Sequence, residues 1–104
     1  MEKQGLERAR HALEQEGATF AAAFPDGRIV ISEKKGIAPM MELLGQDETA
    51  LRGAAVADRV IGRAAAFLLE KGGVAAVYAG IISTHAKDVL ERSGIPFSFG
   101  EEVP

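Results

Sequence analysis

The segment from residue 53 to residue 85 constrains the fold more than any other part of this chain. It holds two apolar runs, residues 54–71 and 74–82, separated by Gly72-Gly73. At the helical period of about 100° per residue, the first run predicts a helix that is apolar almost all round, and such a helix is buried. The second run is short, continuous and rich in small and β-branched residues, which is typical of a central strand covered on both faces. Together they predict an α/β fold.

One carboxylate interrupts the apolar surface of the predicted helix. Arg59, Arg63 and Glu70 share one face, whereas Asp58 falls on the apolar side. Because an unpaired buried charge is very costly, Asp58 is expected to be hydrogen-bonded, paired or facing a cavity. Two interpretations stay open at this point. Asp58 either interacts favourably with the positive N-terminal end of the helix dipole or is a catalytic acid/base.

Length and composition exclude several classes of protein. With 104 residues, of which 47% are hydrophobic, residues 1–104 are expected to form a single α/β domain. The net charge of -3 gives no general attraction to nucleic acid. The absence of cysteine excludes disulfides, thiol catalysis and thiolate-held zinc. No apolar run is long enough to span a membrane and no signal-peptide core follows the charged N-terminus, so we expect a cytoplasmic protein without membrane partners.

Turn residues and helix caps predict the remaining elements. Pro25-Asp26-Gly27 predicts a tight turn between two short strands, Gly17 and Gly45 mark helix ends, and Ser83 is a good N-cap. The expected elements are a surface helix at 2–16, a hairpin of strands 19–24 and 28–32, a short helix at 39–44, a mobile polar stretch at 46–52, a helix from Ser83 to Ser93 and a last strand at 97–99.

Strands separated by helices favour parallel neighbours joined by right-handed crossovers. The predicted architecture is a three-layer α/β/α sandwich in which the first hairpin makes the sheet mixed. Ligands in such sheets collect beyond the carboxyl ends of the parallel strands. The loop 33–52, the start of the helix 54–71 and the turn 82–85 are expected at that edge, where two helix N-termini favour an anion or a polar ligand. The candidate ligand-binding residues are Asp58, Ser83, Thr84, His85, Lys35 and Arg52.

Two roles are expected within this predicted site. Asp58 is the one candidate catalytic residue, whereas Ser83 is explained by its capping position. The stretch 46–52 is expected to act as a lid that exchanges its amide hydrogens quickly, with Gly53 as the hinge into the following helix.

Several of these residues carry a resemblance to a known family. Residues 53–66 read Gly-Ala-Ala-Val-Ala-Asp-Arg-Val-Ile-Gly-Arg-Ala-Ala-Ala. Together with Gly72-Gly73-Val74, Tyr78 and Ile81-Ile82-Ser83, they resemble a bacterial family, the domain of unknown function 1893. The resemblance extends from about residue 19 to residue 104 and implies a cytidine deaminase-like fold.

The same resemblance implies a scaffold without zinc. Zinc deaminases carry His/Cys-x-Glu at the start of one helix and Pro-Cys-x-x-Cys at the start of the next. The compared positions here read Val56-Ala57-Asp58 and Ile82-Ser83-Thr84-His85-Ala86, so every zinc ligand is missing. Asp58 falls near the general acid/base glutamate. The resemblance therefore implies the location of a pocket and argues against hydrolytic deamination.

Three classes of function stay open from the sequence. The first, which we favour, is a domain that binds an unknown small molecule, nucleobase-like or phosphorylated. The second is a metal-independent enzyme that uses Asp58 as acid/base, and the third is a structural or interaction module with a closed pocket. We expect no metal, no cofactor and no nucleic-acid partner, and the apolar excess for so small a domain is compatible with a homodimer.

Overall fold

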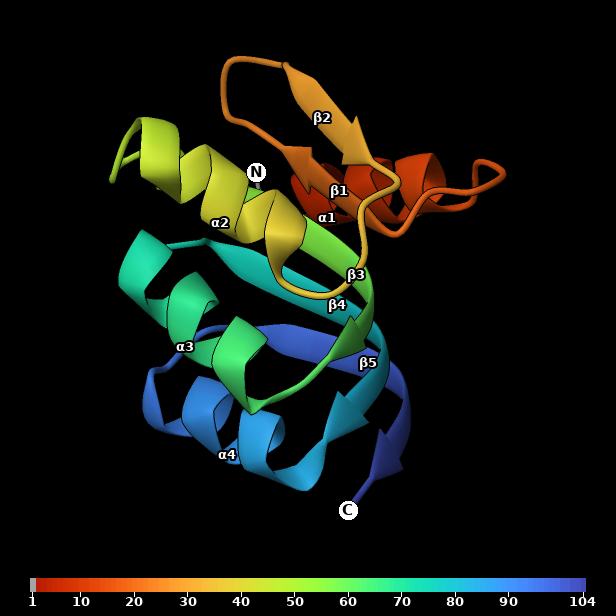
Figure 1. Ribbon diagram of the computed structural model, residues 1–104, viewed down its shortest axis with the longest axis vertical. Coiled ribbons are helices and arrows are strands. Elements are labelled where there is room, and N and C mark those ends of the chain that lie inside the picture. Colours follow the sequence, from red (N-terminus) through yellow and green to blue (C-terminus); the bar gives the residue numbers. More distant parts are fainter. Residues whose placement is uncertain (1) are drawn as a thin grey trace.

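The computed structural model describes residues 2–104, with side chains from Gln4 onward. The elements in chain order are α1 (Glu2–Leu13), β1 (Phe20–Ala23), β2 (Ile29–Ser32), α2 (Ala38–Gln46), β3 (Ala55–Ile61), α3 (Arg63–Gly72), β4 (Ala76–Ser83), α4 (Thr84–Arg92) and β5 (Phe97–Val103). The strands form one sheet in the order β2-β1-β3-β4-β5. Strand β1 is antiparallel to both β2 and β3, whereas β3, β4 and β5 are parallel (Figure 1).

Helices cover both faces of the sheet, α1 on one and α2, α3 and α4 on the other (Figure 1). The two hydrophobic layers differ in the size of their side chains. On the side of α2, α3 and α4, the layer contains large buried residues, among them Phe20, Met40, Leu51, Ile61, Leu69, Ile82 and Leu90. On the α1 side it is almost all alanine: Ala9, Ala12, Ala18, Ala21, Ala23 and Ala57, with Leu13. The predicted three-layer α/β/α sandwich with a mixed sheet is confirmed.

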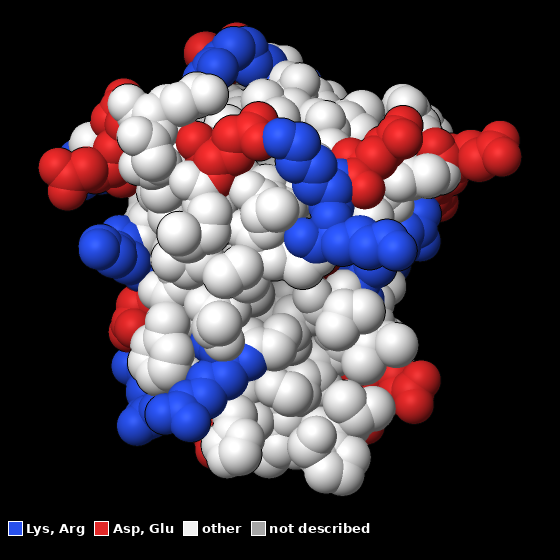
Figure 2. Space-filling model, viewed as in Figure 1, with Lys and Arg blue, Asp and Glu red and all other residues white. Residues whose placement is uncertain are grey.

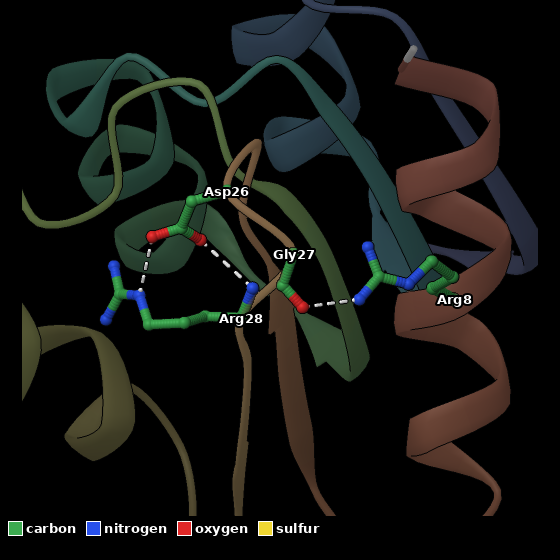
Figure 3. A network of polar contacts seen from close by, with 4 residues as sticks. All are labelled: Arg8, Asp26, Gly27 and Arg28. Atoms are coloured by element: carbon green, nitrogen blue, oxygen red, sulfur yellow. Dashed lines mark hydrogen bonds and ion pairs between the residues drawn. The ribbon is translucent and has the colours of Figure 1, made fainter.

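The predicted hairpin between β1 and β2 is confirmed, and polar contacts fasten its turn (Figure 3). Asp26 accepts two hydrogen bonds from Arg28, from the backbone N–H at 3.0 Å and from Nε at 3.1 Å. The guanidinium of Arg8 on α1 donates to the carbonyl oxygen of Gly27 at 2.6 Å. The turn therefore ties the first helix to the edge of the sheet.

The prediction of a helix over residues 54–71 is wrong. Its first half is strand β3, and the helix α3 begins only at Arg63, after Gly62. A central strand covered on both faces has no polar alternation, so the apolar run fits a buried helix as well as a buried strand. The β-branched Val56, Val60 and Ile61 favour the strand that forms.

The other predicted elements are present, with shifted ends. Helix α1 ends three residues before the predicted end at residue 16, and α2 continues past Gly45 to Gln46. Gly73 closes α3 in the left-handed conformation, and the Ser83 hydroxyl caps α4 by accepting from the Ala86 N–H at 3.1 Å. Strand β5 continues four residues beyond the predicted 97–99, because pairing with β4 carries Glu101 and Glu102 into the sheet.

The three parallel strands share an irregularity near their carboxyl ends. In β4 the core-facing positions shift phase between Ala79 and Ile82, so the side-chain alternation slips by one residue there. A Cβ atom on Gly80 would lie 2.8 Å from the Arg59 carbonyl oxygen of β3, and one on Gly100 would lie 2.8 Å from the Gly80 carbonyl oxygen. Backbones of neighbouring strands approach so closely at this line that only glycine fits.

We expect Gly80→Ala to lower the free energy of unfolding by on the order of 2 kcal/mol, because backbone atoms must move to admit the methyl group. Gly45→Ala is the matched control, since a Cβ there meets nothing within 4 Å. The control should be neutral or slightly stabilising, because alanine is the better helix former. Urea denaturation of the three proteins measures both effects. Equal stabilities for the two variants would contradict the close approach at Gly80.

Candidate functional site

Asp58 is the buried carboxylate of the central strand. It lies in β3, with Phe20 of β1 and Ala79 of β4 as its register partners, and its side chain is 5% exposed. Oδ1 accepts a long hydrogen bond of 3.4 Å from the Val60 N–H. Oδ2 is buried and has no hydrogen-bond partner among the described residues. Buried polar atoms are nearly always paired, so this oxygen calls for an explanation.

The adjacent cation does not neutralise Asp58. Successive residues of a strand point to opposite faces, and Arg59 points to the α1 side. There its guanidinium donates to the carbonyl oxygen of Leu13 at 2.6 Å and also to that of Ala18. Arg59 thereby ties the end of α1 to the sheet, and the Asp58 carboxylate is left without a paired cation among the described residues.

Burial raises the pKa of Asp58 to about 7, from an ordinary value of 3.8. The cause is desolvation, which disfavours the charged form, and hydrogen bonds from the Val60 and Arg59 backbone offset only part of it. Near neutral pH the carboxyl group therefore exists in both its protonated and its ionised form.

A cavity of about 550 Å³ opens at this carboxylate. Asp58 lies in one wall, and the loop that leads from β2 to α2 contributes Lys35 and Ile37. Gly62 and Arg63, at the junction of β3 and α3, complete much of the lining. The site therefore lies where a parallel strand ends and a helix begins, which is where ligands of α/β proteins collect.

A larger hollow, of about 760 Å³, lies between α1 and β2. Its lining combines the half-exposed Ile29 and Ile31 with exposed polar side chains of the helix, such as Glu7 and His11. Asp58 is the one buried charged side chain among the described residues, and it is not part of this hollow. We therefore place the candidate site at the smaller cavity.

The structure brings together only two of the predicted ligand-binding residues, Asp58 and Lys35, in the lining of one cavity. Ser83, Thr84 and His85 lie at the start of α4 and do not line that cavity. Ser83 is occupied as the cap of α4. The Thr84 hydroxyl donates to Glu102 Oε2 at 3.1 Å, and His85 is exposed.

Arg52 and the stretch 46–52 lie at the other end of β3. Arg52 precedes the strand and is six residues from Asp58, a separation of roughly 20 Å along an extended chain. Asp47 and Thr49 form a local turn through the Thr49 N–H at 2.9 Å, and Leu51 is fully buried. The stretch is thus not beside the cavity as a lid would be, and Gly53 leads into a strand, not a helix as predicted.

The sequence interpretation expected the loop 33–52 at the site but missed Ile37 and Arg63 as parts of its lining. The misassigned helix placed Arg63 on a solvent face, whereas it is the first residue of α3. Gly62 carried the missed signal, because a glycine between a β-branched run and a helical run is compatible with a strand-to-helix turn and an N-cap.

Among the described side chains, from Gln4 onward, no group of three or more histidine, aspartate or glutamate residues is arranged to hold a metal ion. None of the described helices has the length and apolar character needed to cross a bilayer.

A family model described as a domain of unknown function, DUF1893 (TM1506), matches residues 8–104. The chain belongs to the DUF1893 family. A crystal structure of a DUF1893 family protein (TM1506) from Thermotoga maritima is similar to it, with a TM-score of 0.86 and 30% sequence identity over 100% of this chain and 69% of that one. No curated protein matches the chain. The predicted membership of the DUF1893 family is thus confirmed.

The free energy of unfolding is expected to fall as the pH rises from about 4 to about 7. In this range the unfolded chain ionises Asp58, whereas the folded protein keeps it protonated up to about pH 7. Asp58→Asn keeps the shape and removes the ionisation. Urea denaturation should therefore give a flatter pH profile for this variant and, at pH 8, a free energy of unfolding higher by on the order of 2 kcal/mol.

Asp88→Asn, on the exposed surface of α4, is the matched control and should leave the pH profile unchanged. A loss of several kcal/mol in Asp58→Asn at pH 8 is the opposite result. It would mean that the carboxylate is one half of a buried pair and serves stability instead of binding.

Proposed function

We propose that this domain binds a small organic molecule in the cavity beside Asp58. The observation that carries the proposal is the Asp58 carboxylate: its Oδ2 atom is buried and has no hydrogen-bond partner among the described residues, and Asp58 belongs to the lining of an open cavity. A hydrogen-bond donor from a bound molecule would give this oxygen the partner that the protein does not supply. The cavity has the volume of an ordinary ligand pocket.

Two ligand classes match the lining of the cavity. A nucleobase-like molecule presents N–H groups along a planar edge, and these suit a carboxylate acceptor such as Asp58. A phosphorylated molecule suits Lys35 and Arg63, the two cations of the lining that are not bound to backbone carbonyl oxygens as Arg59 is. Both classes are small enough to enter a cavity of about 550 Å³.

The second candidate is a metal-independent enzyme that uses Asp58 as a general acid/base. The pKa of Asp58, raised to about 7, favours it, because an acid/base works best when its pKa lies near the working pH. An interaction module with a closed pocket has less support, since the cavity beside Asp58 is open.

We propose the cytidine deaminase-like scaffold without zinc as the framework of this site. The mixed sheet with helices on both faces supports that proposal. The comparison of Asp58 with the catalytic glutamate of deaminases no longer does, because that glutamate stands on a helix and Asp58 stands on a strand. Hydrolytic deamination is not part of the proposal.

The expected surroundings of the protein are proposals as well: a cytoplasmic location, no nucleic-acid partner and a homodimer. On the face of the molecule that Figure 2 shows, acidic and basic side chains are mixed in the upper part, uncharged residues cover much of the lower part, and no broad basic area lies there. Such a surface supports a partner that is not nucleic acid.

Mass spectrometry of small molecules that co-purify with the native protein tests the proposal without choosing a ligand in advance. We expect one molecule to be enriched with wild-type protein. In Asp58→Asn the amount of this molecule that co-purifies should fall at least tenfold. The carboxylate offers two acceptor oxygens, whereas the amide offers one oxygen and an NH2 group, which only donates. Asp58→Leu removes polarity altogether and should lose the molecule as well.

Asp88→Asn is again the matched control and should retain the molecule at wild-type level. Circular dichroism at the purification temperature shows whether each variant is folded. Retention of the same molecule by folded Asp58→Leu would overturn the proposal, and so would binding that depends equally on Asp88.

A further inference from the structure

Three basic residues line the Asp58 cavity: Lys35, Arg59 and Arg63. The Arg59 guanidinium donates to the carbonyl oxygens of Leu13 and Ala18, whereas Lys35 and Arg63 form no ion pair among the described residues. The neighbouring Lys34 differs, because it pairs with Glu42 of α2. Arg63 is the first residue of α3, where a cation opposes the positive end of the helix dipole. Within α3 the Arg63 guanidinium lies over the Phe67 ring, 5.8 Å from its centroid, and it has no carboxylate partner among the described residues, so its charge is available to an anion in the cavity.

The N-terminus of α3 opens into the same cavity. This ten-residue helix begins after Gly62, which provides no side-chain hydrogen bond to the first turn, and the first turn contains no acidic residue. By contrast, the hydroxyl of Ser83 caps α4. Uncapped N–H groups at the positive end of a helix dipole form a natural site for an anion.

Asp58 in the same cavity is a second, independent indication of a ligand. It is only 5% exposed, and its Oδ2 has no hydrogen-bond partner among the described residues. The Asp58 carboxylate thus favours a hydrogen-bond donor, and the N-terminus of α3, with Lys35 and Arg63 nearby, favours an anion.

We infer that the cavity takes one molecule that carries both an anionic group, phosphoryl or carboxylate, and an N–H donor. The anionic group binds at the N-terminus of α3 between Lys35 and Arg63, and the donor binds the carboxyl group of Asp58. A simple anion leaves Asp58 without a partner, and a simple amine leaves the cations without one. This inference rests on the proposed function, which it narrows to one ligand class.

Four small probes separate the two halves of the inference. 2-Aminoethylphosphonate joins an anion to an ammonium donor, ethylphosphonate has the anion alone, and β-alanine and propionate are the corresponding carboxylates. We would titrate each into 15N-labelled wild-type protein and follow the backbone amides of Ala64 and Ala65. The amino compounds should bind about tenfold more tightly than their partners without nitrogen, a difference of about 1.4 kcal/mol.

Variants assign each half to its residues. Arg63→Gln and Lys35→Gln should each weaken all four probes by about tenfold. Asp58→Asn should leave the anions bound and abolish the advantage of the amino compounds. Lys71→Gln, at the opposite end of α3, is the matched control and should change nothing.

Each other outcome has a definite meaning. Anion binding without an advantage for the amino compounds overturns the joined ligand, and shifts that persist in Arg63→Gln overturn the anion site. Phosphonates that bind while carboxylates do not identify the anionic group as phosphoryl, and the reverse identifies it as carboxylate. If no probe binds while a co-purifying molecule still depends on Asp58, the inference fails and the proposed function stands.

Discussion

The burial of β3 between two helical layers is the constraint on which the rest of the molecule depends. Strands flank it on both sides and helices cover both of its faces, so every side chain from Ala55 to Asp58 is buried. In such a place an apolar residue stabilises the fold, whereas a charged residue is destabilising unless something compensates it. Asp58 occupies this strand with only partial compensation, from backbone hydrogen bonds, and this is the reason for proposing a ligand beside it.

The neighbours Asp58 and Arg59 show how the pleat of a strand separates charges that the sequence places side by side. Arg59 reaches backbone carbonyl oxygens at the end of α1, where it stabilises the packing of that helix. Asp58 points to the opposite layer and keeps its unsatisfied oxygen. The same alternation that builds the two hydrophobic layers thus isolates the carboxylate.

The sequence predicted most of the fold because turns and caps act locally. Pro25-Asp26-Gly27, Gly73 and Ser83 perform the roles that their chemistry predicts. The sequence could not distinguish a strand from a helix over residues 55–61, because burial on both faces removes the polar alternation that marks a strand. That error moved the expected site towards α4. Asp58 and Lys35 were still found, since a charge in an apolar run and a basic residue after a strand are visible without the fold.

The alanine layer under α1 determines where partial unfolding of the protein is expected to begin. Each alanine buries little more than one methyl group, worth about 0.8 kcal/mol, so the helix gains less from the hydrophobic effect than the elements on the other face. Its attachment rests in large part on the hydrogen bonds from Arg8 to Gly27 and from Arg59 to Leu13. Proteins open first where few large side chains interlock. The α1 layer is therefore the natural first step of partial unfolding, and the opposite layer, with the Asp58 cavity, can stay closed while it opens.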